Sequence, residues 1–279
     1  MTAVPPPIVD THAHLDDEAF DGDRPEVLER GRSAGVRGVI NIAYRPEIWN
    51  RSVKLREEHP DVELAAGIHP QNAAAFSAAQ SDSLSQRILA LRPLAIGEAG
   101  FDFARPGPSF DQQQSAFQWQ IELAIAADLP LVIHQRDASA QLTRELDLWP
   151  QLRTIVLHSF EGDERLAAWA VDRGCLVGIG GLACRKSSRA LRHALQIVPA
   201  EFLLLETDAP YLAPPNAASR RNEPANLRLI AEALAPLWQL SPAELCKQTT
   251  TNALRVFNFA ALRSSGNAAT VREARSRAL

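Results

Sequence analysis

The chain has 279 residues, of which 46% are hydrophobic, and a formal net charge of −4. This length suits one large domain or two ordinary ones with a sizeable core, and α/β barrels commonly reach it as a single domain. The sequence pI of about 6.0 argues against a protein that coats nucleic acid with a basic surface. It does not exclude an enzyme that grips one or two phosphates through metal ions.

The three cysteines are odd in number and scattered, at positions 175, 184 and 246. Without a Cys-x-x-Cys pair they predict neither a disulfide framework nor a cysteine zinc site, which suits a reducing compartment. The first seven residues lack a basic region followed by an apolar core, and no apolar run is long enough to span a membrane. We therefore expect a cytoplasmic protein without a membrane segment.

Short apolar runs alternate with helical patterns along most of the chain. The apolar runs lack polar alternation, which is typical of strands buried on both faces of a parallel sheet. The predicted strands cover residues 8–14, 36–42, 62–68, 94–98, 131–134, 154–158, 176–180 and 202–208. Helical periodicity and start or stop residues mark the segments between them. These predicted helices cover residues 25–35, 46–58, 84–91, 110–128, 138–146, 164–173 and 187–197.

Two further helices are expected after the last strand, over residues 227–235 and from Ser241 to about Phe257. The second begins with capping-box spacing between Ser241 and Glu244. Eight strand–helix units in this length predict an α/β fold, a single-domain (β/α)8 TIM barrel. We expect the barrel domain to span residues 1–262. Residues 263–279 have little to bury and are expected to form a mobile tail.

Metal-binding residue types gather at the predicted carboxyl ends of the strands, where TIM-barrel enzymes place their active sites. Five of the seven histidines and two carboxylates lie there: His12, His14, His69, Glu98, His134, His158 and Asp208. His12 and His14 alternate on one strand, so both imidazoles point to the same side. A lone His-x-His pair is more often a core or surface feature than a metal site. Here, however, residues of ligand type also stand at the ends of other predicted strands, and this favours the metal site.

Six of these side chains, all but His69, are predicted metal ligands, which is more than one zinc-like catalytic ion takes. Six is the number expected for two divalent ions that share a carboxylate. None of the three lysines ends a predicted strand, so a carboxylated lysine is not available as the bridge, and Glu98 is the candidate. The ligand types suit zinc or manganese, while phosphoryl transfer more often uses magnesium, so the metal stays open.

Seven short motifs follow one another along the chain: Asp-Thr-His-Ala-His-Leu (10–15), Gly-Ile-His-Pro (67–70), Gly-Glu-Ala-Gly-Phe-Asp (97–102), Val-Ile-His-Gln-Arg (132–136), His-Ser-Phe-Glu-Gly (158–162), Glu-Thr-Asp-Ala-Pro-Tyr-Leu (206–212) and Arg-Asn-Glu-Pro (221–224). Together they resemble the TatD family of metal-dependent deoxyribonucleases, within the amidohydrolase superfamily. The resemblance covers residues 8–260 and implies a (β/α)8 barrel with two divalent metal ions. Two positions depart from the family pattern: Glu161 stands where Ser or Thr is usual, and Phe101 where Leu is commoner.

The resemblance also implies a ligand set and an activity. One ion would be surrounded by His12, His14, Glu98 and Asp208, and the other by Glu98, His134 and His158. Known members act as 3′-exonucleases on DNA. We therefore expect a metal-dependent hydrolase of phosphodiester bonds, a 3′–5′ exodeoxyribonuclease that acts on single-stranded DNA ends with two divalent ions (Mg, Mn or Zn).

In this hypothesis a water attacks phosphorus in line while the ions stabilise charge on the attacking and leaving oxygens. Glu98, Asp208 and His69 are the expected catalytic residues. Asp208 would orient or deprotonate the water, and His69 would contact the scissile phosphate or the leaving group. Arg136 would clamp a phosphate, although a surface salt bridge explains this arginine equally well.

Two alternatives stay open. Some relatives remove D-amino acids from tRNA, so a D-aminoacyl-tRNA deacylase, or another two-metal acyl or amide hydrolase, is the alternative enzyme. A non-enzymatic metal-bearing scaffold is the other, and an intact ligand set at an open barrel mouth argues against it. Glu161 near the mouth could alter phosphate affinity and so bears on the substrate. The sequence does not determine the oligomeric state, and a monomer is the simplest expectation.

Overall fold

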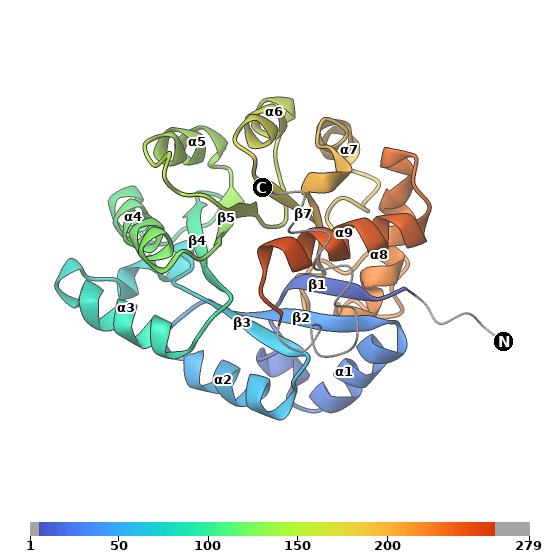
Figure 1. Ribbon diagram of the computed structural model, residues 1–279, viewed down its shortest axis with the longest axis horizontal. Helices are drawn as coiled ribbons and strands as arrows, with labels where there is room; N and C mark the ends of the chain where they lie inside the picture. Colours follow the sequence, from blue (N-terminus) through green and yellow to red (C-terminus); the bar gives the residue numbers. More distant parts are fainter. Residues whose placement is uncertain (1–5, 260–279) are drawn as a thin grey trace.

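The computed structural model describes residues 6–259 and shows eight parallel strands surrounded by helices (Figure 1). The strands follow one another in the sheet in sequence order. They are β1 (Ile8–Ala13), β2 (Val36–Ala43), β3 (Val62–Ala66), β4 (Ala95–Asp102), β5 (Leu131–Arg136), β6 (Ile155–Leu157), β7 (Leu176–Ile179) and β8 (Leu203–Leu205). This arrangement confirms the expected (β/α)8 TIM barrel.

The helices lie outside the strands, as βα connections in a barrel require. They are α1 (Arg24–Ser33), α2 (Trp49–Glu58), α3 (Ser81–Ala90), α4 (Phe110–Ala127), α5 (Ser139–Asp147), α6 (Glu164–Asp172), α7 (Arg189–Leu195), α8 (Leu227–Leu234) and α9 (Pro242–Val256). The expected capping box at the start of α9 is confirmed: Ser241 accepts from the Glu244 N–H, and the Glu244 side chain accepts from the Ser241 N–H. A helix that could cross a membrane is not found within residues 6–259.

The barrel closes where the residues after β8 run beside β1. Thr207 donates through its N–H and its hydroxyl to the Asp10 carboxylate, at 2.9 and 2.6 Å. The Asp208 N–H donates to the His12 carbonyl at 2.8 Å. Because backbone and side-chain bonds hold this seam together, they fix His12 and Asp208 next to each other.

Apolar side chains fill the amino-terminal end of the barrel. Phe257 and Phe259, which follow α9, pack against a layer from near the start of the strands that includes Val9, Ala95, Val132, Val156, Leu176 and Leu204. A larger apolar cluster lies between the strands and the surrounding helices. The polar side chains of the barrel gather at the opposite end, above this packed layer.

One predicted strand boundary was wrong in a way that matters for the site. β4 continues to Asp102 instead of ending at Glu98. Its pairing with β5 shifts register after Gly97, and both Gly97 and Gly100 have positive φ angles, +133° and +136°. Glycine adopts such angles without steric cost, so the bulged strand runs on and carries Asp102 to the mouth.

β8 was also predicted wrongly, since it ends at Leu205 instead of continuing to Asp208. The Thr207 donors go to Asp10, and Asp208 has a φ of +59°, so these residues leave the β7–β8 ladder. Other elements differ by a few residues. α7, for example, begins only at Arg189 because residues 185–188 form a turn. The expected tail at 263–279 and the domain boundary at 262 lie outside the described residues.

Candidate metal centre

The carboxyl ends of the strands open into a cavity of about 770 Å³. Its wall contains seven of the residues expected from the sequence: His14, His69, Glu98, His134, Arg136, His158 and Asp208. His12, the eighth, is fully buried, and its Nε2 lies 3.4 Å from Glu98 Oε2. The structure therefore brings all eight side chains together, although they come from six different strand ends.

The Glu98 carboxylate lies between two groups of histidines. Its Oε1 is 2.7 Å from His134 Nδ1 and 3.2 Å from His158 Nε2. Its Oε2 is 3.4 Å from His12 Nε2. One carboxylate thus presents a different oxygen to each group, which is what a bridge between two ions requires.

His14 and Asp208 lie with His12 on the Oε2 side. Asp208 Oδ1 is 3.3 Å from His14 Nε2 and 3.8 Å from His12 Nε2. The potential ligand atoms of these three residues all lie within 4.8 Å of one another. The barrel seam holds this separation, because the Asp208 N–H donates to the His12 carbonyl and the His14 N–H donates to the Ala209 carbonyl.

Buried polar atoms without a hydrogen-bond partner concentrate in this cluster. Within residues 6–259, eight buried side-chain atoms lack one. Four of them belong here, besides His134 Nε2, which faces the Asp102 carboxylate: both ring nitrogens of His12, Nδ1 of His14 and Oε2 of Glu206. Leaving such an atom unpaired costs roughly 1–3 kcal/mol. Imidazole nitrogens and carboxylate oxygens are ligands of divalent ions, so the residues present fit metal binding.

Two carboxylates that lie within the sequence motifs, and for which no role was predicted, orient the second group of histidines. Asp102 Oδ2 lies 3.4 Å from His134 Nε2, on the opposite side of the ring from Glu98. Glu206 Oε1 lies 3.2 Å from His158 Nδ1 and also accepts the Ser159 N–H. Outer carboxylates of this kind fix ring orientation and raise the basicity of a ligating histidine.

The sequence carried a signal for Glu206 but little for Asp102. Glu206 precedes Asp208 by two residues, the same spacing that identified His12 and His14. Together with His12 and His158 it also forms a group that could itself hold a metal ion. Asp102 reaches His134 only because β4 bulges and continues, which the sequence pattern did not show.

His69 lies close to Glu98, with 3.8 Å between His69 Nε2 and Glu98 Oε1, in a group that also includes His134. Its Nδ1 accepts a hydrogen bond from the Gln71 N–H at 3.0 Å. Burial lowers the pKa of His69 to about 3, so the ring is neutral near pH 7 and carries its proton on Nε2. A protonated nitrogen donates hydrogen bonds but does not ligate a metal, so this tautomer fits a substrate contact.

The carboxylates of the cluster are held in the ionised form that ligands need. Burial alone would raise the pKa of Glu98, but the neighbouring histidines, led by His158, outweigh it and hold the pKa well below its usual range. Burial opposes ionisation of Asp208 as well, and the hydrogen bond from His14 lowers its pKa below the usual value. For His158, burial is outweighed by Glu98 and Glu206, which raise its pKa well above normal, so a metal ion would have to displace a proton from this ring.

Further side chains line the outer part of the cavity. Arg136 is half-buried there and makes no ion pair with a described residue. Glu161 lines the same wall from the loop after β6. The rings of Tyr44 and Tyr211, which the sequence analysis did not single out, have centroids 5.2 and 5.7 Å from that of His14. The mouth thus combines a cation, a carboxylate and two aromatic rings around the cluster.

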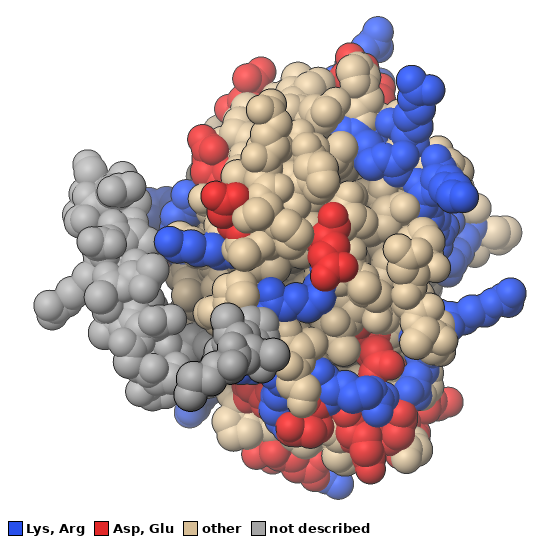
Figure 2. Space-filling view, turned by 90° about the vertical axis from the view of Figure 1, so that its right-hand side faces the viewer, with Lys and Arg blue, Asp and Glu red and all other residues tan. Residues whose placement is uncertain are grey.

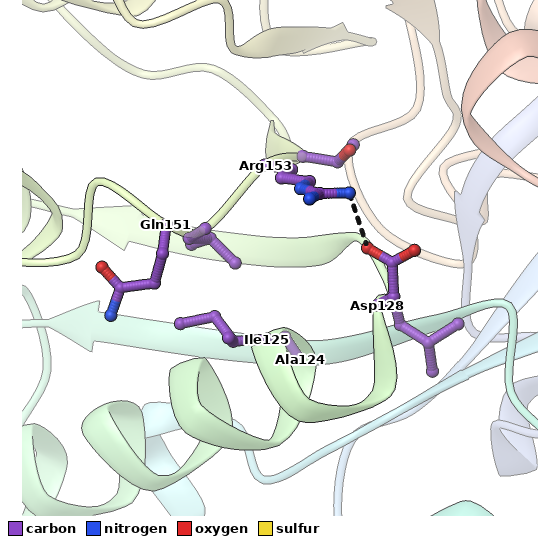
Figure 3. A pocket seen from close by; sticks show the side chains of 8 residues that line it. Ala124, Ile125, Asp128, Gln151 and Arg153 are labelled. Atoms are coloured by element: carbon purple, nitrogen blue, oxygen red, sulfur yellow. Dashed lines mark ion pairs between the residues drawn. The ribbon is translucent and has the colours of Figure 1, made fainter.

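A second, smaller cavity of about 370 Å³ lies between the end of α4 and the start of β6 (Figure 3). Asp128 and Arg153 face each other there at 3.8 Å, and both side chains are more than four-fifths exposed. No group of three potential metal ligands lies in its wall within the described residues. All three groups of potential metal ligands found among the described residues lie at the carboxyl ends of the strands.

Comparisons with known proteins agree with this geometry. A family model described as TatD related DNase matches residues 9–258. The chain belongs to this family. The 3′-5′ ssDNA/RNA exonuclease TatD of Salmonella typhimurium is 36% identical over 255 residues, which cover 89% of this chain and 98% of the relative. The uncharacterized metal-dependent hydrolase TatD of Mycobacterium tuberculosis is 35% identical over 263 residues, covering 92% and 100%.

Solved structures give the same assignment. The crystal structure of a TatD homologue from Escherichia coli K12 superposes with a TM-score of 0.84 at 30% identity, covering 90% of this chain and 98% of that one. A TatD family hydrolase from Entamoeba histolytica, at 20% identity and a TM-score of 0.80, shares the fold. This TatD-family protein is thus a metal-dependent hydrolase that acts on ester bonds.

Proposed function

We propose that this TatD-family enzyme removes nucleotides one at a time from the 3′ end of single-stranded DNA, with two divalent metal ions as its cofactor. The observation that carries the proposal is the position of Glu98, whose two oxygens face different histidine groups. Relatives named 3′-5′ ssDNA/RNA exonucleases support the substrate class. Because their names include RNA, a single-stranded RNA belongs in the same test.

The residues divide into two ligand groups that share Glu98. His12, His14 and Asp208 would hold one ion, and His134 and His158 would hold the other. When bound, magnesium, manganese or zinc would polarise the phosphoryl group and stabilise charge on the attacking and leaving oxygens. Asp102 and Glu206 would keep the imidazoles of His134 and His158 in their ligating orientation.

Three side chains would act on water and substrate directly. Asp208, ionised near neutrality, can orient a water at the mouth of the cluster and accept its proton. His69 can donate its Nε2 proton in a hydrogen bond to a phosphate oxygen. The Arg136 guanidinium, with no carboxylate partner among the described residues, can bind two oxygens of one phosphate.

The shape and charge of the molecule support a single strand that enters by its end. A net charge of −4 gives no long-range attraction for duplex DNA. The cavity is closed at its base by the packed barrel, so it suits a strand that enters by its end. We also propose that the enzyme is monomeric and cytoplasmic, as the sequence led us to expect.

The direct test is an assay with single-stranded oligonucleotides that are labelled at the 5′ or the 3′ end, with each metal supplied in turn. The proposal predicts a 5′-labelled ladder that shortens by one nucleotide at a time and immediate release of a 3′-labelled mononucleotide. Asp208→Asn, purified in parallel, controls for contaminating nucleases.

A closed-circular single strand offers no end and should resist the enzyme. Rapid cleavage of the circle would contradict the exonuclease assignment. If neither DNA nor RNA is cleaved while D-aminoacyl-tRNA is deacylated, the acyl hydrolase takes the place of the nuclease.

A further inference from the structure

The arginines at the mouth of the cavity have no acidic partners among the described residues. Arg105, Arg136, Arg185 and Arg220 line the cavity, and none of their guanidinium groups forms an ion pair or a hydrogen bond with a described residue. By contrast, ion pairs engage Arg24, Arg30, Arg32, Arg51 and Arg221. On the face shown in Figure 2, blue and red atoms intermix in the lower part, and blue atoms gather at the upper right.

These unpaired cations continue outward along one connection, the segment between β7 and α7. Arg185 lines the cavity, Lys186 follows it, and Arg189 begins α7. All three side chains are exposed, and Lys186 and Arg189 also lack ion pairs within residues 6–259. Arg189 borders a surface groove of about 760 Å³ that Ser187 and Arg192 also line. We call Arg185, Lys186 and Arg189 the α7 ridge.

Internal hydrogen bonds hold the ridge in shape. Arg192 Nη1 donates to the carbonyls of Ala183 and Arg185, at 2.8 and 2.6 Å. Ser188 Oγ donates to the Leu182 carbonyl at 2.7 Å. Because hydrogen bonds hold the turn at both ends, its backbone loses little conformational freedom when the side chains bind a ligand.

The acidic loop after β6 borders the ridge on one side. Glu161 lines the main cavity, and Asp163 and Glu164 follow it beside a groove that reaches α7. The carboxylates of this loop repel phosphates because both are negatively charged. A polyanion that leaves the cavity is therefore directed away from this loop. The ridge is thus a row of cations without ion pairs among the described residues, held by hydrogen bonds, that starts at the wall of the cavity.

We propose that the α7 ridge binds the backbone phosphates of a single strand on the 5′ side of the nucleotide in the metal pocket. The inference rests on the proposed function, because it takes the 3′ end to lie in the cavity. Backbone contacts of this kind are independent of base sequence and make binding salt-dependent. The ridge would therefore set affinity for long strands without touching the reacting nucleotide.

The test compares two double variants that remove the same charge. Lys186→Ala/Arg189→Ala neutralises the outer ridge, outside the cavity. Lys54→Ala/Arg153→Ala neutralises two cations whose side chains are 74% and 83% exposed and which lie outside the mouth. Binding of a long single strand with phosphorothioate linkages at its 3′ end is measured by fluorescence anisotropy with Mn²⁺, over a range of salt. Hydrolysis of a dinucleotide is measured in parallel.

The ridge variant should bind the long strand about fivefold more weakly or worse, whereas the control binds like the wild type. Its slope of log affinity against log salt should be shallower by about 1.4, the contribution of two phosphate contacts to a single strand. Dinucleotide hydrolysis should be unchanged. Equal affinity and slope in wild type and ridge variant, or equal losses in both variants, would overturn the inference. A wild type that cleaves no nucleic acid contradicts the proposed function instead.

Discussion

Asp208 shows how a single residue can serve both the fold and the chemistry. Its φ of +59° is a left-handed angle that asparagine also tolerates, so Asp208→Asn should fold normally. The amide can still offer an oxygen to a metal but cannot accept a proton from water. We expect the variant to keep most of its metal and to lose at least about a hundredfold in turnover. Near-normal turnover would mean that Asp208 is a ligand only.

Asp10, two residues before His12, differs from Asp208 in that the pKa of its carboxyl is raised instead of lowered. Burial raises the pKa of its carboxyl to about 7, against the lowering effect of the hydrogen bonds from Thr207 and the His12 N–H. In the unfolded chain this group loses its proton near pH 4. Between these values the folded protein binds more protons than the unfolded chain, so this group makes stability fall as the pH rises.

Asp10→Asn removes this titration and keeps an acceptor for Thr207. The free energy of unfolding of the variant, relative to the wild type, should therefore be higher at pH 8 than at pH 5, by roughly 1–3 kcal/mol. Urea unfolding of both proteins in the presence of a chelator measures this difference. A relative stability that does not change with pH would show that Asp10 is not protonated in the folded protein.

At the scale of secondary structure elements, the order of strands and helices could be predicted and the strand ends could not. The apolar runs and helical periodicity predicted all eight strands and the helices between them. The ends of β4 and β8 depend on contacts between distant segments, such as Thr207 with Asp10, and on a bulge at Gly97. Such tertiary contacts have no local sequence pattern.

In the site, too, some residues could be predicted from the sequence and others could not. Residues at strand ends were predictable because every strand of a parallel barrel delivers its carboxyl end to one mouth, and this rule found His12, Glu98 and His158. The supporting carboxylates were missed because their roles depend on which ring nitrogen they face. The tautomer of His69, likewise, required the position of the Gln71 N–H.

The contact between the Glu206 carboxylate and the His158 imidazole can be tested with Glu206→Gln. Glu206, after β8, holds the imidazole of His158, after β6. Loss of the carboxylate should weaken metal affinity by about 10- to 100-fold, the usual cost of removing an outer-shell partner. Titration calorimetry with Mn²⁺ or Zn²⁺ measures the change.

Glu145→Gln is the matched control for this variant. Glu145 is also a buried carboxylate that accepts hydrogen bonds from side chains, Gln114, Gln118 and Trp149, but it lies on α5 outside the cluster. We expect Glu145→Gln to change stability and leave metal affinity unchanged. Equal metal affinity in Glu206→Gln and wild type would show that His158 needs no support from Glu206.

At the scale of the whole molecule, a mildly acidic protein has four arginines without ion pairs to described residues at the mouth of its barrel. The net charge of −4 predicted the absence of a basic coat but not the concentration of arginines at the mouth, because net charge does not record which cations are paired. The barrel seals the other end with Phe257 and Phe259. Ligands, water and substrate thus meet at the same opening, with Glu98 at its base.

The number of metal ions per chain, in the wild type and in Glu98→Ala, tests whether two ions share the Glu98 carboxylate. Because one carboxylate faces both histidine groups, we predict two ions per wild-type chain and weakened binding of both in the variant. Elemental analysis after dialysis gives the count, and circular dichroism checks that the variant is folded. A folded Glu98→Ala protein that still holds two ions, or a wild type that binds only one, would contradict the shared carboxylate.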